Sequence, residues 1–126
     1  GDEIGMTGGN DPDCRRMMRF DDWNNREEAL FEKVAALNHL RRGNMALVYG
    51  DYMQLHVGEQ TFAYARKYFD TNVVVCINNS TEEQTFELDV EALNASGYKA
   101  LFGKEYKLEG NKLTITLPAL TSEVLY

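Results

Sequence analysis

The clearest helical pattern in this chain lies between residues 26 and 40, where apolar side chains recur every three or four positions. The central apolar positions are Leu30, Val34 and Leu37, and Phe31 and Leu40 flank them. Asn24 and Asn25 precede the pattern as candidate N-terminal caps, and Gly43 follows it as a candidate residue just beyond the C-terminus. The pattern therefore predicts one amphipathic α-helix with a single apolar face.

From Met45 onward the period of the pattern changes from 3.6 to 2, which is typical of β-strands. The alternating segments are 53–57, 62–68, 86–90 and 113–117. Residues 73–77 are apolar throughout, as in a strand that is covered on both faces. His56 alternates with its apolar neighbours, so we expect it at the surface. Short strands without helices between them predict a mainly β fold, an antiparallel Greek-key β-sandwich of about seven or eight strands.

Charge and composition exclude several classes of partner. The net charge of −7 and the lack of a basic stripe argue against a nucleic-acid-binding protein. No apolar run approaches the roughly 20 residues of a membrane span, so we expect no membrane partner. His39 and His56 are the only histidines, and the acids near the N-terminus lack the spacing of a calcium-binding loop. Cys14 and Cys76 are far apart and are interpreted as free thiols, and we expect neither a metal nor a cofactor.

The first fifteen residues have a composition that predicts a shaped loop. They contain four glycines, a proline and several acidic residues, a mixture that does not favour a regular helix or strand. Pro12 fixes its own φ angle and restricts Asp11 before it. A polar loop of this kind indicates either a binding surface or a structural connection with acids at its turns.

The order of the residues in this loop distinguishes these interpretations. The segment GDEIGMTGGNDPDCRRMM resembles the one that follows the eighth barrel strand in the α-amylase family, glycoside hydrolase family 13, and especially its neopullulanase and cyclomaltodextrinase branch. The matching positions are Gly1, Asp2, Glu3, Gly5, Met6, Asp11, Pro12, Arg15 and Met18. Phe20 stands where many members have Trp, and the resemblance to the rest of the chain is weaker.

The resemblance implies a domain organisation and an activity. Residues 1–43 correspond to loop eight and the last helix of a (β/α)₈ barrel, and residues 44–126 to a C-terminal β-sandwich. The family's nucleophile, acid/base and stabilising carboxylates follow earlier barrel strands, and none of their motifs is present, so we assign no catalytic residue. We therefore expect a fragment, inactive alone, of an enzyme that hydrolyses α-1,4 links of starch, pullulan or cyclodextrin type with retention. The cytoplasm and the periplasm remain open as its location.

The same resemblance implies a substrate subsite at Asp11 and Arg15, which match the positions of the Asp-Pro-x-x-Arg motif that contact a glucose in the family. A carboxylate can accept hydrogen bonds from sugar hydroxyls, and a guanidinium can donate them. The alternative is an ion pair between the two side chains that only fixes the loop. Asp2 and Glu3 are interpreted as structural.

Two further alternatives concern the rest of the chain. The aromatic residues Tyr49, Tyr52, Phe62, Tyr64 and Tyr68 favour either ordinary cross-strand packing or an exposed row for stacking sugars. A free-standing α-glucan-binding module would require such an exposed row. A third alternative is a purely structural or interaction domain. Finally, a barrel helix without its barrel leaves an apolar face in water, so we expect self-association through the helix face.

Overall fold

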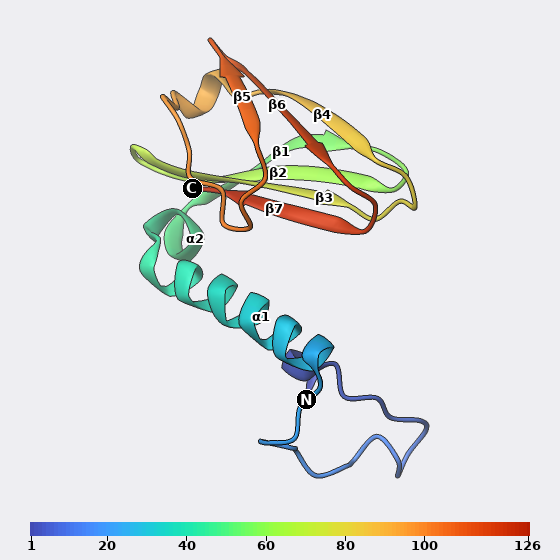
Figure 1. Ribbon diagram of the computed structural model, residues 1–126. Coiled ribbons are helices and arrows are strands. Elements are labelled where there is room, and N and C mark those ends of the chain that lie inside the picture. Colours follow the sequence, from blue (N-terminus) through green and yellow to red (C-terminus); the bar gives the residue numbers. More distant parts are fainter. The chain divides into compact units, whose positions relative to one another are not determined.

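The computed structural model describes residues 1–126 and divides the chain into two compact units, residues 1–41 and residues 42–126. The helical elements are η1 (Asp2–Ile4), α1 (Asn25–Gly43), α2 (Met45–Tyr49) and η2 (Glu91–Leu93). The strands are β1 (Asp51–Val57), β2 (Thr61–Tyr68), β3 (Thr71–Asn78), β4 (Gln84–Asp89), β5 (Tyr106–Glu109), β6 (Lys112–Leu117) and β7 (Thr121–Leu125). Figure 1 shows these elements along the chain.

The predicted helix is present as α1, and its start is fixed by reciprocal capping. The side chain of Asn24 accepts hydrogen bonds from the backbone N–H groups of Arg26 at 2.9 Å and Glu27 at 3.2 Å. The carboxylate of Glu27 in turn accepts from the backbone N–H of Asn24 at 2.9 Å. These contacts satisfy donors that the first turn of a helix cannot pair internally. No residue of α1 is fully buried, and Leu37 is 40% exposed.

The prediction of an extended chain from Met45 onward is wrong for its first five residues, which form the short helix α2. Asn44 caps this helix by accepting from the backbone N–H groups of Ala46 at 2.9 Å and Leu47 at 3.4 Å. Gly43 therefore does not lie beyond the helix as expected: it is the last residue of α1, and the chain turns directly into the next cap. The apolar residues of α2 match a buried strand as well as a helix, so the cap decides between them.

Unit 42–126 is an antiparallel sandwich of seven strands, which confirms the predicted fold class and strand number. One sheet has the order β1-β2-β3-β7 and the other the order β4-β6-β5 (Figure 1). The chain passes between the sheets after β3 and again after β6. The description of this order as a Greek key stays a prediction. Strands β5 and β7 were not among the segments with a recognisable alternation.

The core fills the space between the two sheets. Its buried members are Ala63, Ala65, Val74, Cys76 and Leu125 from one sheet, Phe86, Leu88, Leu113, Ile115 and Leu117 from the other, and Val90 and Leu93 from the connection after β4. Val73 and Val75 are buried on the opposite face of β3, beside which α2 packs. The prediction that this strand is covered on both faces is therefore confirmed for residues 73–76.

The prediction that His56 lies at the surface is wrong. The pairing of β1 with β2 shifts between Gln54 and His56, and such a bulge moves the following side chains to the opposite face. The imidazole therefore turns toward the core, where it contacts the ring of Phe86 edge-on at a centroid distance of 5.5 Å. Its Nε2 atom also forms a 2.8 Å hydrogen bond with the hydroxyl of Thr61.

Two buried polar side chains connect the strands to the irregular segments. The carboxylate of Glu123 is fully buried in β7 and accepts hydrogen bonds from the backbone N–H groups of Phe102, Lys104 and Val124, each at 2.8 Å. The amide of Asn78 donates to the carbonyl oxygens of Glu82, Leu117 and Pro118. Each side chain thus holds a loop against the end of a strand.

Candidate functional site

The N-terminal loop begins with one regular element that its composition did not predict. Residues 2–4 form the 3-10 helix η1, and Ile4 at its end is buried. Gly5 ends the helix with a φ of 62°, a left-handed conformation that favours glycine. The N–H groups of Asp13 and Arg15 then donate to backbone carbonyls three residues earlier, at 2.9 and 3.0 Å, so residues 10–15 form two successive turns.

The structure brings the two predicted site residues together on these turns. The Nε atom of Arg15 lies 2.6 Å from a carboxylate oxygen of Asp11, which makes an ion pair. Both side chains are largely exposed, at 77% for the arginine and 60% for the aspartate. The contact uses one oxygen of the carboxylate and one nitrogen of the guanidinium, so the remaining acceptors and donors face water. Chemically, this pair can accept from one hydroxyl group and donate to another.

A second ion pair in the same loop was not predicted. Arg16 donates to both carboxylate oxygens of Asp13, with distances of 2.7 and 2.8 Å from Nη2 and 3.0 Å from Nε. The N–H of Gly9 also donates to Asp13 at 2.7 Å. The guanidinium and then this N–H hold the pKa of the Asp13 carboxyl below its usual value. The signal in the sequence was the Asp-x-x-Arg spacing of residues 13–16, which repeats the type of pairing that residues 11–15 make.

Two open hollows border the loop, and neither contains the predicted pair. One, of about 320 Å³, lies among Gly1, Asp2, Met6, Thr7, Gly8, Cys14, Arg16 and Met18. The other, of about 250 Å³, lies among Gly5, Met6, Thr7, Arg16, Met17, Arg19 and Glu27, and its last two members form an ion pair. Arg16 borders both hollows, whereas Asp11 and Arg15 project from the loop.

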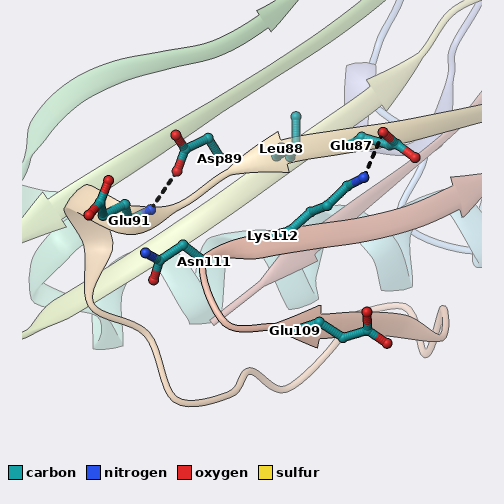
Figure 2. A pocket seen from close by; sticks show the side chains of 7 residues that line it. All are labelled: Glu87, Leu88, Asp89, Glu91, Glu109, Asn111 and Lys112. Carbon is teal, nitrogen blue, oxygen red and sulfur yellow. Dashed lines mark hydrogen bonds and ion pairs between the residues drawn. The ribbon is translucent and has the colours of Figure 1, made fainter.

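A pocket on the sandwich has a different character (Figure 2). It measures about 510 Å³ and lies among Glu87, Leu88, Asp89, Glu91, Glu109, Asn111 and Lys112. Lys112 pairs with Glu87 at 2.9 Å, and Asp89 accepts from the backbone N–H of Glu91 at 2.9 Å. Two of the acids thus have a partner within the pocket, and no group of three or more His, Cys, Asp or Glu side chains in the chain could hold a metal ion.

The two thiols have opposite surroundings. Cys14 is exposed in the N-terminal loop, and Cys76 is buried between the sheets. Burial, followed by the charge of Glu123, raises the pKa of the Cys76 thiol to about 12. No helix is long and apolar enough to cross a membrane.

Comparison with known proteins shows which family this chain resembles. Residues 50–125 match the family model described as the alpha-amylase C-terminal domain. A cyclomaltodextrinase from Geobacillus thermopakistaniensis is 35% identical over 120 residues, which are 94% of this chain and 20% of that protein. Neopullulanase 2 from Thermoactinomyces vulgaris is 35% identical over 131 residues, 100% of this chain and 22% of that protein. The chain thus spans about a fifth of the length of these relatives.

A solved structure of similar sequence has the same fold as this chain. The native debranching enzyme of Nostoc punctiforme superposes with a TM-score of 0.84 at 33% identity, over 99% of this chain and 26% of that one. The resemblance to the neopullulanase and cyclomaltodextrinase branch that the loop residues indicated is therefore confirmed. This chain belongs to the alpha-amylase C-terminal domain family.

Proposed function

We propose that this chain is the C-terminal portion of a glycoside hydrolase that acts on α-glucans, with residues 1–43 completing the catalytic barrel and residues 44–126 forming the accessory sandwich. The observation that carries the proposal is the match to cyclomaltodextrinase and neopullulanase relatives over nearly the whole chain, the loop included. Their names refer to α-glucan substrates, and the proposal extends that substrate class to this protein. The catalytic carboxylates lie in the barrel strands that precede residue 1.

Within this enzyme, Asp11 and Arg15 bind a glucose unit of the substrate. Loops after barrel strands lie at the catalytic face, where exposed polar side chains reach the ligand. The exposure of both side chains, 77% for Arg15 and 60% for Asp11, supports this role because a substrate could reach them, whereas their 2.6 Å contact is equally expected of an ion pair that only fixes the loop. Each hydrogen bond to a charged side chain contributes about 1.5–3 kcal/mol, which corresponds to roughly tenfold or more in affinity.

The test replaces Asp11 or Arg15 with alanine in the full-length enzyme and measures kcat/KM for maltooligosaccharides of increasing length. We expect a loss of about tenfold or more for substrates long enough to reach this subsite, and a small loss for shorter ones. An equal loss for every length would indicate that the ion pair only fixes the loop. Asp13→Ala and Arg16→Ala are the matched controls, since they break the neighbouring ion pair and should lower kcat/KM without a dependence on length.

Residues 1–126 alone should release no reducing sugar from maltooligosaccharides, cyclodextrins or pullulan. Retaining hydrolysis needs two carboxyl groups facing each other across the scissile bond, and a single barrel loop cannot supply that arrangement. Reproducible hydrolysis that is lost when one of the chain's own acids is replaced would contradict the proposal that the catalytic carboxylates lie outside residues 1–126.

The isolated chain should also self-associate through α1. Leu30, Phe31 and Leu37 are 36–40% exposed on this helix, and a two-fold contact between copies would bury them. Sedimentation velocity over a concentration range should show a dimer that Leu37→Glu removes. The matched control is Asn38→Glu, which adds the same charge at an adjacent polar and exposed position and should leave the dimer intact. A monomer at high micromolar concentration would contradict this part of the proposal.

A further inference from the structure

Sulfur-containing side chains are concentrated in the N-terminal loop. The chain has five methionines and two cysteines, and four of these seven residues lie within the first eighteen positions: Met6, Cys14, Met17 and Met18. Three of the four, Met6, Cys14 and Met18, line one hollow of about 320 Å³ beside the loop. We call these three residues the sulfur cluster. The proposed substrate subsite uses none of them.

The backbone of the loop packs closely around the sulfur cluster. Cys14 lies in the second of the two turns that residues 10–15 form. A β-carbon on Gly8 would lie only 2.9 Å from the Cα atom of Cys14, and one on Gly1 would lie 3.1 Å from the Sδ atom of Met6. The lack of a side chain at these two glycines is what lets the backbone approach so closely. A larger residue at either position would displace the thiol or the thioether beside it.

The exposure of these side chains leaves one reactive group open to solvent. Met6 and Met18 are half-buried, whereas the adjacent Met17 is 90% exposed. Cys14 is exposed, and its one polar side-chain contact, with a carboxylate oxygen of Asp11, is 4.0 Å long. The thiol therefore loses little when it turns toward the hollow. Methionine has three rotatable bonds, so small rotations can direct both thioether sulfur atoms to the same point.

The types of ligand in the sulfur cluster select the kind of metal ion. Thiolate and thioether sulfur atoms are soft ligands that favour Cu(I), whereas Mg²⁺ and Ca²⁺ take oxygen ligands. A structural zinc site needs four ligands, usually Cys or His, and the chain has no group of three or more His, Cys, Asp or Glu side chains that could hold a metal ion. A Cu(I) site is not excluded by this finding, because two of its three ligands are methionines.

The charges around the hollow suit a monovalent cation. The carboxylate of Asp2 lines the hollow, and so does the guanidinium of Arg16. The Nη2 atom of Arg16 lies 2.7 and 2.8 Å from the two carboxylate oxygens of Asp13, and this ion pair offsets the positive charge of the arginine. Cys14 must lose its proton to bind a metal ion, so the thiolate adds one negative charge. That charge balances the single positive charge of Cu(I).

We propose that Met6, Cys14 and Met18 form a binding site for Cu(I). The thiolate of Cys14 supplies the anionic ligand, and the two thioethers complete a set of three sulfur ligands. Cys14 occupies a position that the Asp-Pro-x-x-Arg motif leaves open, so the thiol is a feature of this chain and not of the motif. The site is independent of the proposed function, since it requires neither a sugar nor the catalytic carboxylates.

The test titrates residues 1–126 with Cu(I) under anaerobic conditions, in competition with a chromophoric Cu(I) chelator. We expect one Cu(I) per chain, because Cys76 is buried, and Cys14→Ser should abolish the binding. Met6→Leu and Met18→Leu nearly keep the side-chain volume and should each weaken the affinity about tenfold, because one sulfur ligand is lost. Met17→Leu is the matched control: it removes an adjacent thioether that is 90% exposed and lies outside this hollow, and the affinity should not change.

NMR of methionines labelled with ¹³C at the methyl group gives a second measurement, which does not depend on any variant. Diamagnetic Cu(I) should shift the methyl signals of Met6 and Met18 and leave those of the other three methionines in place. An unchanged affinity in both Met6→Leu and Met18→Leu would show that the thiol binds alone, and the proposal would be overturned. Equal shifts at all five methionines, or full binding by Cys14→Ser, would also overturn it. None of these outcomes bears on the proposed subsite, which is measured by kcat/KM of the full-length enzyme.

Discussion

Replacing Glu123 with glutamine should destabilise the sandwich, because this carboxylate is fully buried and accepts three backbone hydrogen bonds. One oxygen accepts from the N–H groups of Phe102 and Val124, and the other accepts from Lys104. A glutamine keeps one acceptor oxygen but presents an NH₂ group at the second position. At least one backbone donor is then left facing another donor, and the remaining bonds lose their charge assistance.

The size of the destabilisation can be derived from the number of hydrogen bonds that are lost or weakened. One lost hydrogen bond to a charged acceptor, with its donor left buried, costs about 1.5–3 kcal/mol, and weakening of the others adds to it. Glu123→Gln does not bury a charge, and the absence of this desolvation penalty offsets part of the loss. We expect a net loss of about 2–3 kcal/mol in the free energy of unfolding, or roughly 10–20 °C in Tm for a domain of this size.

Thermal melts and urea titrations followed by near-UV circular dichroism measure this effect, with Glu105→Gln as the control at an exposed position of the same segment. Hydrogen exchange at the amides of Phe102 and Lys104 should accelerate in Glu123→Gln and stay unchanged in the control. A Tm equal to or above that of the wild type would mean that desolvation of the carboxylate outweighs its hydrogen bonds. The reasoning about this buried group would then be refuted.

Three other predictions can be checked with the same chain. A disulfide reagent should modify Cys14 rapidly and Cys76 only in denaturant, and two rapid thiols would contradict the buried position of the second. Burial raises the pKa values of the Cys76 thiol and the Tyr98 phenol from their usual values to about 12. The folded state therefore favours the neutral form of both groups. The free energy of unfolding should be unchanged below about pH 9 and fall as the pH rises toward 12. A Tm that does not depend on pH over this range would contradict this prediction. Asn78→Ala should cost about 2–4 kcal/mol in urea titrations, since it leaves carbonyl oxygens at the end of β6 without a donor, and a loss below 1 kcal/mol would contradict this.

The pattern of apolar positions predicted the elements that show either a clear alternation or a continuous apolar run. Helix α1 and the strands β1 to β4 and β6 were recognised in this way. Strand β7 was not, because buried Glu123 interrupts its apolar residues and only the backbone donors of a distant loop explain a carboxylate there. His56 was assigned to the wrong face because a bulge adds one residue to β1. An alternation of apolar and polar residues in the sequence does not show where such an extra residue lies.

The candidate site, too, was only partly predictable from the sequence. The pairing of Asp11 with Arg15 was anticipated only as the alternative to a substrate subsite, which the motif in this loop indicated. The pair formed by Asp13 and Arg16 has a similar spacing and better geometry, but several acids and arginines in the loop can pair in more than one way. Only the two successive turns of the backbone decide which acid meets which base.

The central claim, that this chain completes an α-glucan hydrolase, is tested most directly by reading the coding sequence upstream of the codon for Gly1. The account predicts an open frame that continues into the strands of a (β/α)₈ barrel and encodes an aspartate nucleophile, a glutamate acid/base and a second stabilising aspartate. A frame that begins within a few codons of Gly1, or that joins the chain to a protein without these three carboxylates, would contradict it.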